Sequence, residues 1–195
     1  IFKEKLKANP VPVQIPIGAE EKFEGVIDLI EMKAVRWYED ENKGTNYSLE
    51  EIPADLVEQA EEWRGKLVES VAEVDDEILE RYFEDPESIT KDEMLNVIRR
   101  ATIEGVIIPM MCGSAFKNKG VQRLLDSVCA FLPRPLDNGD ITGLNPDNDK
   151  EIIRTASVDE PLAALAFKIA TDPFVGRLAY LRVYSGKIDA GSQVL

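Results

Sequence analysis

Apolar residues recur at three- and four-residue steps between residues 52 and 72, which predicts a helix with one buried face. The apolar stripe consists of Leu56, Ala60, Trp63, Leu67 and Val71. Trp63 lies on this stripe, so we expect it in the core rather than against a ligand. The glutamates that fall off the stripe are Glu58, Glu61, Glu62 and Glu69. They must face water or a partner.

Shorter patterns predict the elements on either side of this helix. Thr90 and Glu93 have the spacing of a capping box, so a helix should follow Thr90. Apolar runs predict strands at 11–17, 23–29, 33–38 and 106–111. The last of these strands leads through a loop of small residues into an amphipathic segment at 121–132. The backbone amides of such a loop would face a ligand bound at the end of the strand.

The pattern changes after residue 132. Prolines and an Asn-Gly-Asp sequence interrupt regular structure, and the polar stretch that runs to Lys150 predicts a linker or a long loop. Runs at 162–169 and 176–185 then predict β-strands. We therefore expect an α/β part followed by an all-β part.

Charge and composition narrow the possible functions. Net charge is −14, and residues 50–87 alone hold 15 acidic and 3 basic residues, or −12. A surface this acidic disfavours DNA or long RNA and fits either a basic protein partner or a solvated helical face. The chain has no histidine and only Cys112 and Cys129, so no metal site is predicted, and both cysteines are expected to be buried and reduced. No apolar run is long enough for a membrane span.

The loop before the last helix carries the most specific motif. It reads Gly-Ser-Ala-Phe-Lys-Asn-Lys-Gly-Val over residues 113–121, which resembles the fifth GTPase motif of the elongation factor G family. Residues 9–29 resemble the entry into that family's insertion subdomain. Residues 167–176 and 182–186 resemble the start of its second domain, a β-barrel. The three motifs follow the family's order and cover essentially the whole chain.

The resemblance implies a domain layout. Residues 1–134 would be the C-terminal part of a P-loop GTPase domain, with an α+β insertion subdomain at about 18–104. Residues 135–157 would be a linker, and 158–195 the start of an incomplete all-β barrel. The full-length protein would bind GTP or GDP with Mg²⁺ and use GTP hydrolysis to move tRNA and mRNA on the ribosome, in the cytoplasm.

The resemblance also implies site residues. Ser114 and Ala115 would offer backbone amides to the guanine edge, with Phe116 flanking it. Glu58, Glu61, Glu62 and Glu69 would bind the basic C-terminal domain of the ribosomal stalk protein. Lys117 and Lys119 would contact nucleotide or RNA, or would be solvated.

The hydrolytic machinery is missing from this sequence. No Gly-x-x-x-x-Gly-Lys-Ser/Thr loop is present, and Val121 stands where the guanine-reading motif has aspartate. We therefore expect no catalytic residue, no bound nucleotide or metal, and no GTPase activity in this chain alone. The alternatives are a free-standing acidic interaction module and the matching fragment of a related translational GTPase such as peptide release factor three.

Overall fold

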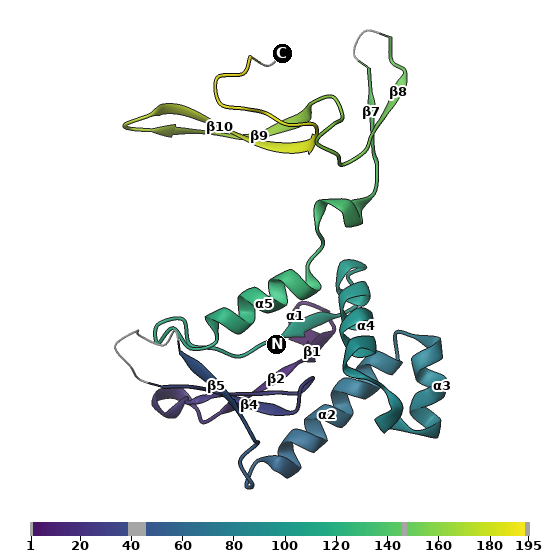
Figure 1. Ribbon diagram of the computed structural model, residues 1–195, viewed down its shortest axis with the longest axis vertical. Helices are drawn as coiled ribbons and strands as arrows, with labels where there is room; N and C mark the ends of the chain where they lie inside the picture. Colours follow the sequence, from purple (N-terminus) through teal and green to yellow (C-terminus); the bar gives the residue numbers. More distant parts are fainter. Residues whose placement is uncertain (1, 39–45, 146–147, 194–195) are drawn as a thin grey trace. The chain divides into compact units, whose positions relative to one another are not determined.

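The computed structural model describes residues 2–38, 46–145 and 148–193 (Figure 1). The chain divides into two compact units, Ile1–Leu132 and Pro133–Leu195. The first unit holds the helices and the principal core. The second is built from β-hairpins, in agreement with the predicted change from α/β to β structure.

A four-stranded antiparallel sheet forms the middle of the first unit, in the order β2-β3-β4-β5. Its strands are β2 (Gln14–Ile17), β3 (Gly25–Asp28), β4 (Lys33–Trp37) and β5 (Tyr47–Glu50). A separate parallel pair joins β1 (Pro10–Pro12) to β6 (Ile108–Met110). The predicted strand at 11–17 is thus divided between two sheets. Val13 links them, since its N–H donates to the Met110 carbonyl and its carbonyl accepts from Leu29, each at 3.0 Å.

The helices of this unit are α1 (Phe2–Lys5), α2 (Val57–Ala72), α3 (Asp76–Glu84), α4 (Lys91–Ile103) and α5 (Val121–Phe131). Thr90 and Glu93 form the predicted capping box at the start of α4. The helix predicted from residue 52 begins only at Val57, because Pro53 opens a turn in which its carbonyl accepts from Leu56 N–H. The strand β5 was not predicted.

Both faces of the four-stranded sheet are buried. Val26 and Ile27 are neighbours on β3 and therefore point to opposite faces, yet each is 0% exposed. Ile27 belongs to the main core, which includes Leu67 and Ile98 of the helices. Val26 belongs to a smaller cluster with Trp37, against which Cys112 packs. The loop that precedes α5 therefore helps to cover the second face of the sheet (Figure 1).

The second unit contains two antiparallel hairpins. The strands β9 (Ala163–Asp172) and β10 (Gly176–Ser185) confirm the two predicted β runs. The strands β7 (Ile141–Leu144) and β8 (Glu151–Arg154) lie inside the segment predicted as a linker. That prediction of irregular structure is corrected here, because residues 141–144 and 151–154 pair as an antiparallel hairpin. Within the described residues these sheets stay open and do not close a barrel.

Candidate functional site

The loop between β6 and α5 is closed by its own backbone. Ser114 N–H donates to the Lys119 carbonyl at 2.8 Å, and Lys119 N–H donates back to the Ser114 carbonyl at 3.0 Å. Inside this bridge, Asn118 N–H donates to the Ala115 carbonyl at 3.1 Å. Residues 114–119 therefore form a small closed turn, which we call the guanine loop after the contact that the family resemblance implies for it.

Two glycines let the ends of the guanine loop approach each other. Gly120 has φ +93°, and a Cβ on it would lie 2.9 Å from the Cys112 carbonyl oxygen. A Cβ on Gly113 would lie 3.0 Å from the Lys119 carbonyl oxygen. Any larger residue at either position would force two backbone segments apart. The small residues of the motif are thus explained by geometry, whether or not a ligand is present.

A hollow of about 220 Å³ lies against the guanine loop. Its lining comes from the end of β6, the loop and the first turn of α5. These residues are Met111, Cys112, Gly113, Ser114, Ala115, Lys119, Gly120, Val121 and Leu124. The hollow is largely apolar, so a planar ring could lie in it with its edge toward the backbone of the loop.

The three predicted guanine-edge residues differ in whether they have a hydrogen-bond donor free to contact a ligand. The Ser114 amide is already donated to Lys119, so only the Ser114 hydroxyl could act as a further donor. Within the described part of the chain the amide of Ala115 donates no hydrogen bond, and Ala115 lines the hollow. The Phe116 side chain is fully exposed and lies outside that lining. Ala115 is therefore the best-placed donor for a ligand.

Both loop lysines donate hydrogen bonds to backbone carbonyls of the protein. Lys119 is 7% exposed, and its Nζ donates to the Phe23 carbonyl at 3.4 Å. Lys117 Nζ donates to the Glu21 carbonyl at 2.8 Å. Both acceptors belong to the segment between β2 and β3, 96 residues away in the sequence. The expectation of a solvated lysine is wrong for Lys119, because this side chain is buried and its ammonium group donates to the Phe23 carbonyl.

The first turn of α5 is also tied to the sheet. Arg123 donates to Asp28 Oδ2 at 2.5 Å, and both side chains are largely buried. Asp28 Oδ1 accepts from the amides of Ile30 and Glu31 at 2.9 and 3.0 Å, so this carboxylate is fully used. Burial alone would lower the pKa of the Arg123 guanidinium, but the hydrogen bond and charge of Asp28 raise that pKa above its ordinary value. No sequence pattern identified this pair.

Two further contacts complete the attachment. Trp37 Nε1 donates to Gln122 Oε1 at 3.2 Å, so Trp37 is a core residue and not a ligand-stacking one. Cys112 packs against the Trp37 cluster, and burial raises the pKa of its thiol. The expectation that both cysteines are buried is wrong for Cys129, which is exposed.

The acidic face of α2 lies where the sequence placed it. The four predicted glutamates are exposed, whereas Ala60, Leu67 and Val71 are buried and Trp63 is half-buried against the core. At about 100° per residue these glutamates fall within a ~100° arc opposite the stripe. Glu62 pairs with Lys66 at 2.5 Å. In the described part of the chain, Glu58, Glu61 and Glu69 form no ion pair.

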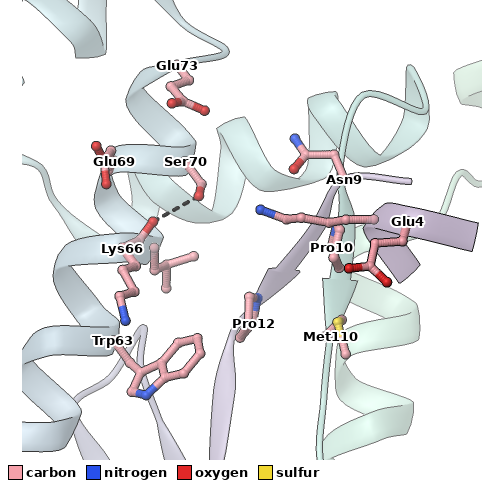
Figure 2. Close-up of a pocket in the computed structure, with 12 residues that line it drawn as sticks. Glu4, Asn9, Pro10, Pro12, Trp63, Lys66, Glu69, Ser70, Glu73 and Met110 are labelled. Carbon is pink, nitrogen blue, oxygen red and sulfur yellow. Dashed lines mark hydrogen bonds between the residues drawn. The ribbon is translucent and has the colours of Figure 1, made fainter. Parts of the chain in front are cut away.

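A larger hollow, of about 650 Å³, lies between α2 and the β1–β6 pair (Figure 2). Trp63, Lys66 and Ser70 line it from α2, and Ser70 Oγ donates to the Lys66 carbonyl at 2.9 Å. Glu69 of the acidic face also stands on its rim. Its lining holds both carboxylates and ammonium groups, which do not converge on one point, so the hollow offers no catalytic arrangement.

The described residues offer neither a metal-binding cluster nor a membrane-spanning helix. No group of three or more histidine, cysteine, aspartate or glutamate side chains is arranged to hold a metal ion. No helix there is long and apolar enough to cross a membrane.

Comparison with known proteins extends these observations. No protein-family model matches the chain. Elongation factor G of Amoebophilus asiaticus (strain 5a2) is 57% identical to it over 193 residues, which is 99% of this chain and 27% of that protein. Elongation factor G of Cytophaga hutchinsonii is 51% identical over 192 residues, which is 98% of this chain and 27% of that protein. The chain thus spans about a quarter of the length of these curated relatives.

A solved structure is similar over the same extent. A crystal structure of a Thermus thermophilus protein matches with a TM-score of 0.73 and 28% identity, covering 98% of this chain and 25% of that one. Because these matches run through both units, they disfavour a free-standing acidic module.

Proposed function

The chain belongs to the elongation factor G family, as a segment of it, and we propose that it supplies the guanine-edge loop and the insertion subdomain of a translational GTPase. Residues 1–134 would be the C-terminal part of the GTPase domain, with the insertion at about 18–104. Residues 135–157 would link it to the β-barrel domain that begins at 158. The whole protein would hydrolyse GTP with Mg²⁺ to move tRNA and mRNA on the ribosome, in the cytoplasm.

The guanine loop is the observation that carries this proposal. Its closed backbone leaves the Ala115 amide available beside the hollow of about 220 Å³ that could hold a planar ring. A backbone donor that meets the purine 6-position favours the carbonyl of guanine over the amino group of adenine. The Ser114 hydroxyl and the flanking Phe116 ring would complete the edge contact.

The apolar side of α5 fits a role inside a larger domain. Leu124, Leu125 and Val128 are 49%, 59% and 41% exposed, and Ile108 on neighbouring β6 is 47% exposed. Exposed apolar residues grouped on one side of a helix are normally covered by other elements. We propose that the remainder of the GTPase sheet covers them.

Nucleotide binding provides the test. Full-length elongation factor G that contains this segment should bind GDP and hydrolyse GTP, whereas the 195-residue chain alone should do neither. Phosphate contacts, which supply most nucleotide affinity, need a loop that this sequence lacks. Calorimetry with GDP and a phosphate-release assay distinguish the two proteins. Micromolar GDP affinity of the chain alone, or no binding by the full-length protein, would contradict the proposal.

The acidic face of α2 supports a second element of the proposal, a basic partner on the ribosome. We propose that Glu58, Glu61, Glu62 and Glu69 bind the C-terminal domain of the stalk protein. Exposed charges are individually weak, so the contact should be loose and steeply salt-dependent. The Debye length falls from about 10 Å at 0.1 M salt to about 3 Å at 1 M, which should remove most of the attraction.

Charge-reversal variants distinguish binding by the acidic face of α2 from a general effect of the protein's net charge. The triple change of Glu58, Glu61 and Glu69 to lysine should abolish the NMR shifts that the stalk domain causes in α2. The matched control reverses three exposed glutamates elsewhere, Glu80, Glu84 and Glu87, and should keep binding at a reduced association rate. Equal losses in the two triple variants would leave only a nonspecific effect of charge.

A further inference from the structure

The guanine loop and the first turn of α5 that follows it both contact residues far away in the sequence. Lys117 and Lys119 donate to carbonyls 96 residues away, Gln122 accepts from Trp37 across 85 residues, and Arg123 pairs with Asp28 across 95. All four contacts reach one element, the sheet β2–β5 with its connecting turns.

The loop has few other supports. The strand that leads into it, β6, is three residues long and pairs with β1 in the described part of the chain. The loop's internal bonds close a turn that contains Asn118 at φ +54°, a conformation that non-glycine residues adopt less readily. Such a backbone keeps one shape when its surroundings over-determine it. The sheet provides these surroundings.

We propose that the insertion sheet β2–β5 positions the guanine loop, with Lys119 and the Arg123–Asp28 pair as its positioning residues. The inference rests on the proposed guanine-binding role of the loop. Asp28 and Arg123 lie outside the lining of the hollow, so neither needs to touch the nucleotide. The contacts of all three residues set where the Ala115 amide stands, because the Lys119 side chain ties the loop to the sheet and Arg123 fixes the helix that begins directly after Gly120.

The arrangement has a consequence for regulation. The sheet whose second face holds the guanine loop packs its first face against α2, which carries the acidic surface on its opposite side. A displacement of the sheet would therefore reach the guanine loop through Phe23 and Asp28. Two sites that are coupled in this way affect each other's affinity reciprocally.

The test compares two nucleotides in full-length elongation factor G containing this segment. GDP and 6-thio-GDP differ only at the purine 6-position, where sulfur is the weaker acceptor. Their affinity ratio thus reports the loop contact and not phosphate binding. We expect the unmodified protein to favour GDP by about fivefold, the worth of one neutral hydrogen bond.

Asp28→Asn and Lys119→Met should bring this ratio close to one while GDP still binds. Asp28→Asn suits the purpose because asparagine Oδ1 can still accept from the amides of Ile30 and Glu31. The matched control is Arg81→Ala, which removes the α3–α4 ion pair with Glu93 and should leave the ratio unchanged.

Each outcome is decisive. A ratio that stays near fivefold in a folded Asp28→Asn protein would overturn the positioning role, and so would an equal fall in Arg81→Ala. A ratio of one in the unmodified protein would instead refute the guanine-edge contact, and failure to bind GDP would refute the proposed function itself.

Discussion

Two glycines flank the guanine loop, Gly113 and Gly120, and comparing their alanine variants with Gly105→Ala, outside the loop, separates backbone strain from backbone contact. Gly105 has φ +75° and no atom within 4 Å of the point where a Cβ would lie, so alanine there meets only the left-handed strain. Gly113 has an ordinary φ, and its Cβ would meet the Lys119 carbonyl at 3.0 Å. Gly120 combines φ +93° with a 2.9 Å approach to the Cys112 carbonyl.

The expected losses follow from these distances. The left-handed conformation costs a non-glycine residue about 1–2 kcal/mol, which is the loss expected for Gly105→Ala. Forced overlap in a packed region adds about 1–3 kcal/mol. Gly120→Ala should therefore lose about 2–5 kcal/mol, the sum of the two effects. Gly113→Ala should lose about 1–3 kcal/mol from overlap alone.

Tryptophan fluorescence during urea unfolding measures these losses. Both tryptophans of the chain, Trp37 and Trp63, lie in the first unit, so the signal reports that unit. A common slope with shifted midpoints would give the differences directly. If Gly120→Ala and Gly105→Ala lost equal stability, the close approach to Cys112 would cost nothing, and the geometric explanation of the motif would be refuted.

Two further outcomes are expected. The pKa of Glu93 is lowered to about 2, chiefly by Arg81, so the stability that the ionised Glu93 contributes is complete above pH 4.5, the ordinary pKa of a glutamate, and is lost as pH falls toward 2. The Glu93→Gln variant should therefore lose less stability than the unmodified protein over this pH range. Acid unfolding followed by circular dichroism tests this, and identical curves for the two proteins would contradict it. Cys129 is exposed whereas burial raises the pKa of Cys112, so a thiol reagent at about pH 7.5 should modify Cys129 first, and equal labelling by mass spectrometry would count against the packing of Cys112.

The sequence predicted what depends on local periodicity. The stripe of α2 and the capping box of α4 need only residues a few positions apart, and both are present. The order strand, small loop, helix around residues 106–132 is present too, although β6 is shorter than predicted. The strand β5 was missed because Tyr47–Glu50 is half exposed and lacks a clear alternation of apolar residues.

The anchors of the guanine loop could not be predicted in the same way. Lys117 and Lys119 look like solvated loop residues because a lysine carries no sign of its acceptor, and here the acceptors are backbone carbonyls 96 residues away. Any sequence at Glu21 and Phe23 would provide those carbonyls. Backbone acceptors leave no pattern in side-chain chemistry, so only the fold identifies them.

One feature of the sequence could have indicated that another element covers the second face of the sheet. Val26, Ile27, Leu29 and Ile30 form a nearly continuous apolar run, whereas a strand with one wet face alternates. All four are buried. Asp28 interrupts the run and forms an ion pair with Arg123. A carboxylate in so apolar a strand needs a cationic partner on the covering element. The run could therefore have suggested a cover with an inward basic residue, although no pattern singles out Arg123; α5, the helix that follows the guanine loop, supplies that residue.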